Sequence, residues 1–224
     1  MLLNIEKLRK EYKRGNTSFF AVDSACLSVE HHDFICITGR SGSGKSTFLN
    51  MVAGLLTPTS GTIALHGNDY STMNDKQISK LRNESIGFIP QGQCLLPNLT
   101  VLDNVRLPFY LSKRNGDIHE KAMSLLKKVG IADLADMYPA QLSGGESRRV
   151  SIARALINSP SIVIADEPTS NLDKETAKEI MKLFSHITST GIAMLLVTHN
   201  LEFVEYGNKI YSMDAGKLIE GSRA

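Results

Sequence analysis

A glycine-rich run directly after a short apolar segment is the feature that most limits how this chain can fold. The segment Phe34-Ile-Cys-Ile-Thr38 is typical of a buried strand, and it leads into Gly39-Arg-Ser-Gly-Ser-Gly-Lys-Ser46. Residues 46–53 then form a helical run that ends at Gly54, with Pro58 beyond it. A strand, a glycine loop and a helix in this order place backbone N–H groups and a helix dipole where they bind phosphate. The sequence therefore predicts an α/β fold built around a phosphate-binding loop.

The residues of this loop have separate expected roles at a nucleotide phosphate. Lys45 supplies charge to the outer phosphates, the Ser46 hydroxyl reaches Mg²⁺, and Thr47 reaches the inner phosphate. The predicted phosphate-binding set is Gly39, Arg40, Ser41, Gly42, Ser43, Gly44, Lys45, Ser46 and Thr47. A flexible glycine turn without a ligand is the alternative for the loop taken alone.

Two adjacent carboxylates follow a second apolar strand. Asp166 and Glu167 come directly after Ile162-Val-Ile-Ala165, so both are expected at the carboxyl edge of a buried sheet, where phosphates bind. Asp166 is predicted to hold Mg²⁺, and Glu167 to accept a proton from the attacking water. An acidic turn at a strand end would explain the pair alone, but the pair occurs together with Lys45.

Two further polar residues follow apolar strands in the same way. His199 comes after the run 192–198, a position that favours a contact to the γ-phosphate or to the catalytic water. Gln91 follows Ile86-Gly-Phe-Ile-Pro90, where its amide could reach both metal and water. Pro90 is expected to stiffen the chain before Gln91.

The rest of the pattern divides the chain into regions. Residues 2–8 and 19–29 have strand composition, with the second run broken by the turn-like pair Asp23-Ser24. Residues 92–157 are predicted to be a helical insertion, in which Asp117 begins a helix through an N-cap and a capping box with Glu120. The α/β core then resumes, with a helix over 174–187.

Leu142-Ser-Gly-Gly-Glu146 is a second glycine motif that faces phosphate. It lies about a hundred residues after the first motif. A second motif of this kind makes sense when two copies of the chain share one nucleotide.

Bulk composition excludes several classes of protein. A net charge of +2 over 224 residues gives no strong field for polyanions, so nucleic acid is not expected as a partner. Cys26, Cys36 and Cys94 match no metal or redox pattern and are expected to be reduced. The charged N-terminus lacks a signal peptide core, and the longest apolar run falls short of the ~20 residues that cross a bilayer. We therefore expect a cytoplasmic protein whose membrane role depends on another chain.

Taken together, these residues resemble the nucleotide-binding subunit of an ATP-binding-cassette (ABC) transporter over essentially the whole chain. The matching motifs are the Walker A loop Gly39 to Thr47, the Q-loop Gln91, the signature Leu142 to Glu146, the Walker B segment Ile162 to Asp166 with Glu167, the D-loop Ser170 to Asp173 and the switch His199. Arg40 in place of proline and Ser147 in place of glutamine depart from the common pattern, but neither removes a catalytic group.

The resemblance implies a fold and a set of site residues. The fold is a single P-loop NTPase domain over 1–224, with a RecA-like core, an N-terminal antiparallel β subdomain and a helical ABC-specific subdomain at 92–157. The implied catalytic residues are Glu167, His199, Gln91 and Lys45, and the implied metal ligands are Ser46, Gln91 and Asp166. The implied nucleotide contacts beyond the phosphate loop are Tyr12, Gln91, Ser143, Gly144, Gly145, Asp166, Asp173 and His199.

The resemblance also implies a function. The chain is expected to form a homodimer around two Mg·ATP, with Ser143 to Gly145 acting on the partner's nucleotide, and to energise a separate membrane permease on the inner face of the membrane. Tyr12-Lys-Arg-Gly15, Ala165-Asp-Glu-Pro-Thr169 and Leu99 to Pro108 resemble the subgroup that serves lipoprotein release, macrolide and peptide export, antimicrobial-peptide resistance and cell division. This favours export or extraction of peptides, lipoproteins or hydrophobic antimicrobials.

Several alternatives remain open at this point. Within that subgroup, a regulatory scaffold that uses ATP without transport is the main one, although Glu167 and His199 are retained. A soluble cassette ATPase that acts on ribosomes or DNA would need a second cassette or a long coiled-coil insertion, and the sequence has neither. Tyr12 is expected to stack on adenine, a core tyrosine being the alternative, and Phe19 and Phe20 are weaker candidates for that contact.

Overall fold

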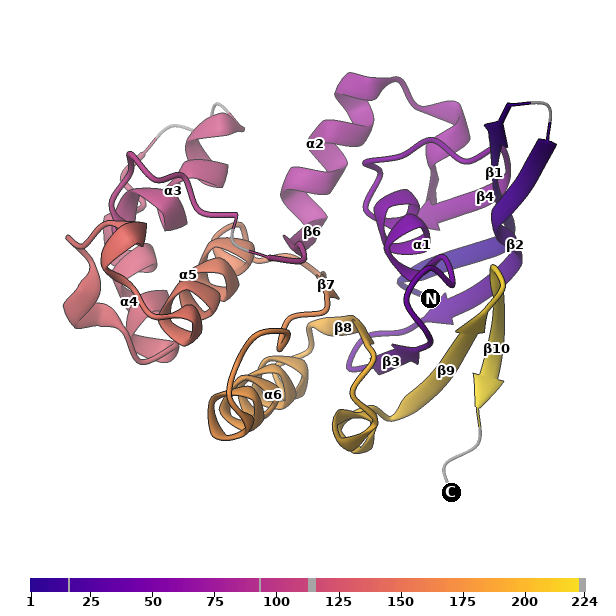
Figure 1. Ribbon diagram of the computed structural model, residues 1–224. Helices are drawn as coiled ribbons and strands as arrows, with labels where there is room; N and C mark the ends of the chain where they lie inside the picture. The colour runs from indigo at the N-terminus through magenta and orange to yellow at the C-terminus, as the bar shows by residue number, and fades with distance from the viewer. Residues whose placement is uncertain (16, 93, 113–115, 222–224) are drawn as a thin grey trace.

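A six-stranded sheet forms the centre of the molecule (Figure 1). The computed structural model describes residues 1–15, 17–92, 94–112 and 116–221. The strand order is β10 (Lys217–Gly221), β9 (Lys209–Asp214), β3 (Phe34–Thr38), β8 (Ala193–Thr198), β7 (Ile162–Asp166) and β6 (Ile86–Ile89). All neighbours are parallel except β10, which returns antiparallel to β9. Parallel strands of this kind end at one shared edge, where ligands bind.

A second, antiparallel sheet packs beside the first one. It contains β2 (Thr17–Val29), β1 (Leu3–Arg14), β4 (Ser60–Leu65) and the short β5 (Asn68–Asp69), in that order. The predicted break at Asp23-Ser24 is wrong, because β2 runs through these residues. Ser24 instead adopts a positive φ of 51° where the pairing with β1 shifts register, as in a β-bulge.

The helices lie on the two faces of the central sheet. Helices α1 (Lys45–Val52) and α2 (Asp75–Ser85) belong to the first half of the chain, and α1 packs on the face of the central sheet that is turned toward the antiparallel sheet. Helix α6 (Lys174–Ser189) covers the opposite face of the central sheet. Figure 1 shows α3 (Val101–Leu111), α4 (His119–Lys128) and α5 (Gly144–Leu156) gathered away from the antiparallel sheet. Short 3₁₀ turns cover 70–72, 132–134, 139–141 and 201–206. In the described part of the chain, no helix has the length and apolar composition needed to cross a membrane.

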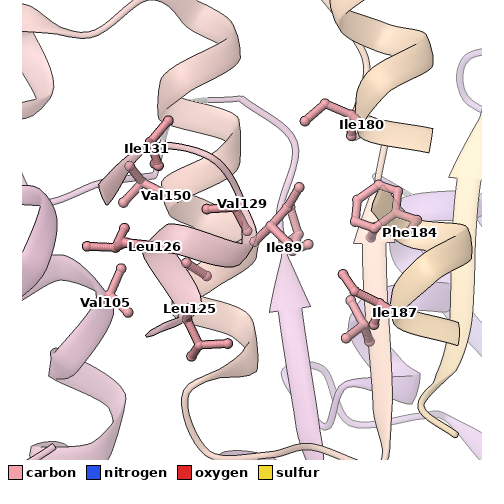
Figure 2. Close-up of a cluster of buried hydrophobic side chains, with 14 of the residues drawn as sticks. Ile89, Val105, Leu125, Leu126, Val129, Ile131, Val150, Ile180, Phe184 and Ile187 are labelled. Carbon is pink, nitrogen blue, oxygen red and sulfur yellow. The ribbon is translucent and has the colours of Figure 1, made fainter. Parts of the chain in front are cut away.

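Alternation along the central strands divides the buried side chains into two cores. In β3, Ile35 and Ile37 pack toward α1 and the antiparallel sheet, whereas Phe34 and Cys36 pack toward α6 and the helical region. Figure 2 shows Ile89 of β6 between the helices that carry Leu126 and Phe184. The central strands are therefore buried on both faces, which explains why their sequences are almost continuously apolar.

The start of α4 differs from its predicted form. The helix begins at His119 with Ile118 at the N-cap position, so the predicted capping box between Asp117 and Glu120 is wrong. Asp117 still contributes, because its Oδ1 accepts the N–H of His119 at 2.8 Å. The carboxylate therefore lies one residue too early to be the N-cap but still accepts a backbone N–H at the helix start.

Candidate active site

The carboxyl ends of β3, β6, β7 and β8 open onto one pocket of about 830 Å³. Phosphate-loop, strand-end and aromatic residues from distant parts of the sequence line it: Tyr12, Phe19, Phe20, Ala21, Ser41, Gly42, Gly44, Lys45, Ser46, Thr47, Gln91, Glu167, His199, Ala215 and Gly216. The structure thus gathers most of the predicted site residues. Phe19 and Phe20, the weaker candidates for the adenine contact, also line the pocket, whereas the turn at 215–216 was not predicted to lie there.

Tight backbone packing fixes the phosphate loop in front of α1. Gly44, at the N-cap of α1, has a φ of 106°, and a Cβ at this position would collide with the carbonyl oxygen of Ala21. Lys45 is 7% exposed, and its Nζ donates to the carbonyls of Gly39 (2.7 Å) and Arg40 (2.8 Å). The ammonium group is therefore anchored inside the loop that begins the helix.

Ser46 lines the pocket, and the buried Asp166 lies beside it. Burial raises the pKa of Asp166, and the neighbouring Ser46 hydroxyl and the Lys45 charge lower it in part. Asp166 is 6% exposed, and its Oδ1 lacks a hydrogen-bond partner within the described residues. A buried carboxylate oxygen without a partner is expensive, and a divalent cation with oxygen ligands would satisfy it. The pair therefore fits the chemistry of a Mg²⁺ site.

Glu167 and His199 form a hydrogen-bonded pair beside this site. Glu167 Oε2 lies 2.8 Å from His199 Nδ1 and also accepts the backbone N–H of His199 at 3.3 Å. Glu167 is 7% exposed and has a φ of 48°, a strained conformation of the kind found at functional sites. Its N–H donates to the carbonyl of Val197, which fixes the residue between β7 and β8.

Aromatic side chains from the first hairpin form the outer wall. Tyr12 and Phe19 pair directly across β1 and β2, with ring centroids 6.0 Å apart and tilted by 32°. The Nζ of Lys10 lies 5.5 Å from the centre of the Tyr12 ring. Tyr12 is 37% exposed, so the alternative of a core tyrosine does not fit. Phe19, a weaker candidate from the sequence, lies directly opposite Tyr12 because the two strands pair at these residues.

The signature residues lie at the start of α5, outside this set of lining residues. Ser143 is the N-cap of α5 and forms a capping box with Glu146. Hydrogen bonds from the Ser143 backbone and hydroxyl lower the pKa of Glu146. A Cβ on Gly145 would lie 2.7 Å from the Thr176 methyl group on α6, whereas one on Gly144 would lie 3.5 Å from Leu172. Gly145 therefore permits the close approach of α5 and α6.

Asp173 also lies outside the pocket lining. Its carboxylate caps α6 by accepting the N–H groups of Glu175 (3.1 Å) and Thr176 (3.0 Å). The Thr176 side chain and these backbone N–H groups lower the pKa of Asp173. A role at a nucleotide remains a prediction for Asp173, as it does for Ser143, Gly144 and Gly145.

A phosphate loop at the carboxyl edge of a parallel sheet, with a buried carboxylate opposite its serine, defines a P-loop nucleotide-binding protein. The family model described as ABC transporter matches residues 22–170. The chain belongs to the ABC transporter family, as its ATP-binding, ATP-hydrolysing component.

Curated relatives specify the subgroup. The lipoprotein-releasing system ATP-binding protein LolD of Blochmanniella floridana is 41% identical over 219 residues, 97% of this chain and 93% of the relative. An uncharacterized ABC transporter ATP-binding protein, YknY of Bacillus subtilis, is 39% identical over 222 residues, 99% of this chain and 96% of the relative. The macrolide export ATP-binding/permease protein MacB of Chlorobaculum tepidum is 36% identical over 98% of this chain, which covers 34% of that longer protein.

Solved structures confirm the predicted fold class. The dimeric, post-hydrolysis form of the ATP-binding cassette MJ0796, bound to ADP and Pi, is 34% identical with a TM-score of 0.92, and the match covers 100% of both chains. The ADP form of the cassette MJ1267 is 27% identical with a TM-score of 0.83, over 99% of this chain and 91% of the other. The chain is therefore an ATPase subunit of the LolD and MacB type.

Proposed function

We propose that two copies of this chain close around two Mg·ATP, so that each nucleotide lies between one copy's phosphate loop and the other copy's signature. The main observation in support is that Ser143 and Gly144 are exposed at the N-terminus of α5 and do not line the nucleotide pocket of their own copy. Helix N-termini with exposed N–H groups bind anions. The dimeric MJ0796 cassette, similar over its whole length, supports such an arrangement.

A buried carboxylate next to the exposed Ser46 of the phosphate loop supports a Mg²⁺ site. Ser46, Asp166 and Gln91 would hold the ion; the Ser46 hydroxyl is close enough to Asp166 to lower its pKa, and Ser46 and Gln91 both line the pocket. Bound Mg²⁺ supplies charge neutralisation at the phosphates. The unpartnered Oδ1 of Asp166 is the group that gains most from the ion.

The protein's own residues supply positioning and proton transfer for hydrolysis. Glu167 accepts the proton of the attacking water, and His199 holds that carboxylate through Nδ1, which leaves Nε2 as the ring nitrogen for the γ-phosphate or the water. Lys45 binds the outer phosphates from a loop that already fixes its ammonium group. Positioning of this kind and electrostatic stabilisation supply most of the rate in phosphoryl transfer.

ATP hydrolysis would then energise a separate membrane permease, which places the chain on the inner face of the membrane. A groove of about 900 Å³ between α2, β6, the end of α3 and the end of α5 supports this partner. Its edge carries Leu111, which is 68% exposed, together with Lys76 and Lys80. The names of the LolD and MacB relatives, a lipoprotein-releasing system and a macrolide exporter, favour release of lipoproteins or export of macrolides.

Dimerisation can be tested with a variant that retains ATP. Glu167→Gln removes the proton acceptor while preserving the size of the side chain, so this variant with ATP and Mg²⁺ is expected to elute as a dimer in size-exclusion chromatography. The wild-type chain with ADP is the matched control and should elute as a monomer. A Glu167→Gln variant that remains monomeric at high protein and ATP concentration contradicts the shared site.

The rate of ATP hydrolysis in the assembled complex distinguishes a transport function from a regulatory scaffold. The permease can be obtained by co-purification with a tagged copy of this chain, and the complex reconstituted in vesicles. We expect ATP hydrolysis that the permease stimulates and that Glu167→Gln abolishes. A complex that assembles with ATP but shows no turnover would favour the scaffold instead.

A further inference from the structure

The segment that carries Gln91 is tied to the signature helix at two backbone positions. Arg148 Nη1 donates to the carbonyl of Pro90 at 3.1 Å, directly before Gln91. Arg154 Nη1 donates to the carbonyl of Cys94 at 2.9 Å, three residues after Gln91. Both arginines belong to α5, so one helix holds the chain on both sides of the glutamine.

Arg148 is unusually enclosed for an arginine. It is 6% exposed, and burial lowers its pKa. Long charged side chains are seldom fully buried unless they are paired, because desolvation of the charge is costly. A guanidinium enclosed in this way needs the Pro90 carbonyl as an acceptor, and bonds from charged donors are the stronger ones.

The second attachment point uses a side chain as well as the backbone. Arg154 Nη2 lies 2.8 Å from Cys94 Sγ, which in turn lies 3.8 Å from Ser151 Oγ on the same helix. Cys94 is therefore in contact with successive turns of α5. Pro90 and Cys94 are consequently both held against the same helix.

We propose that Arg148 and Arg154 are positioning residues for ATP hydrolysis: they make the entry of Gln91 into the pocket depend on where α5 lies. Helix α5 begins at the signature, and Gln91 lines the pocket of the same copy. A nucleotide held against the signature of one copy would thus influence the glutamine at that copy's own nucleotide. This inference rests on the role of Gln91 given under the proposed function.

The neighbouring arginine provides a matched control. Arg149 lies on the same helix, but its Nη1 donates to the carbonyl of Val129 at 3.0 Å and its Nη2 pairs with Glu179 on α6. Arg149→Gln therefore removes an arginine of α5 that holds other helices and not the Gln91 segment. The control separates loss of packing around α5 from loss of the tie to Gln91.

The test compares Arg148→Gln, Arg148→Lys, Arg149→Gln and Gln91→Ala in the full-length chain, by kcat, KM and thermal midpoint. Arg148→Gln is expected to lower kcat roughly tenfold, the size expected from the loss of one charge-assisted hydrogen bond. KM for ATP is expected to change less than about threefold, because the phosphate loop is untouched. Arg148→Lys, which keeps a charged donor, should recover part of kcat, and Arg149→Gln should lower the midpoint without this loss of kcat.

The decisive measurement is the double variant Arg148→Gln with Gln91→Ala. If Arg148 acts through Gln91, the double variant should hydrolyse ATP as fast as Gln91→Ala alone. Independent, multiplying losses of kcat would overturn the inference, as would an equal loss of kcat in Arg149→Gln. If Gln91→Ala keeps the wild-type kcat, the proposed role of Gln91 in hydrolysis is wrong. If Gln91→Ala lowers kcat but Arg148→Gln does not, Gln91 keeps its role and only the inference about Arg148 is wrong.

Discussion

Glu167 Oε2 and His199 Nδ1 are 2.8 Å apart, so the two residues expected to activate water are already joined in the structure. Because carboxylate oxygens only accept, an imidazole that bonds to Glu167 through Nδ1 carries its proton there when neutral. The 2.8 Å distance connects the ends of β7 and β8, which are neighbours in the sheet. His199 is therefore also a positioning residue for the carboxylate.

This pairing predicts that the two nitrogens of His199 contribute separately. His199→Ala should lower kcat by roughly 10²-fold, at the lower end of what a positioned acid–base group supplies. His199→Asn places an amide N–H near the former Nδ1, so it should recover part of that loss by holding Glu167. His199→Gln, whose amide extends toward the former Nε2, is the matched comparison. If His199→Gln is faster than His199→Asn, the bond to Glu167 is not the more important contact.

Replacing Asp166 is expected to raise the stability of the fold and to abolish activity. Its pKa is raised, so the ionised form destabilises the folded chain; this cost is absent below the pKa of the unfolded chain and develops as pH rises through the folded pKa. At neutral pH, Asp166→Asn should therefore raise the thermal midpoint of the nucleotide-free protein, on the order of 2–4 °C for each kcal/mol regained. The same variant should lose Mg²⁺-dependent hydrolysis.

Calorimetric scans at several pH values measure this effect. The stability difference between Asp166→Asn and wild type should shrink as pH falls toward 4, close to the ordinary aspartate pKa. Ser46→Ala is the control, since it removes the hydroxyl partner and leaves the buried carboxylate in place. An Asp166→Asn variant less stable than wild type at pH 7 would show that the charge is compensated in the fold.

Replacing each of the two signature glycines by alanine is expected to change the stability of the protein by different amounts. Gly145→Ala puts a methyl group 2.7 Å from the Thr176 methyl, and such overpacking typically costs about 1–3 kcal/mol. Gly144→Ala makes only an ordinary contact at 3.5 Å and should leave the midpoint near that of wild type. Chemical denaturation of both variants measures the difference. Equal stabilities would show that α5 and α6 separate easily.

How far the sequence predicted these features depends on how local their causes are. The phosphate loop, the strands before Asp166 and His199, and the helix after Asp173 follow from short-range patterns, and the structure agrees with them within a few residues. In contrast, β9 and β10 were not predicted, because β9 owes its place to pairing with β3 about 170 residues earlier. The bulge at Ser24 has the same kind of cause, since it depends on register with β1.

The candidate site shows the same limit. Strand-end positions placed Glu167 and His199 near each other, but no local pattern shows that Nδ1 is the nitrogen in contact. Arg148 illustrates the limit most clearly, since its burial and its bond to Pro90 join residues 58 positions apart. Contacts of this length depend on how complete helices pack, which periodicity does not encode.

The outer wall predicts a selective change in nucleotide affinity. Tyr12→Ala removes one ring of the pair with Phe19, and base stacking on aromatic side chains is typically worth about 1–3 kcal/mol. KM for ATP should therefore rise roughly tenfold while kcat changes little, because the phosphate loop and Glu167 are unaffected. Tyr12→Phe keeps the ring and should behave as wild type. Phe19→Ala should raise KM less than Tyr12→Ala if Phe19 mainly supports the tyrosine ring. A Phe19→Ala variant with the larger rise in KM would show that Phe19 is the ring that stacks on the base, and Tyr12 its support.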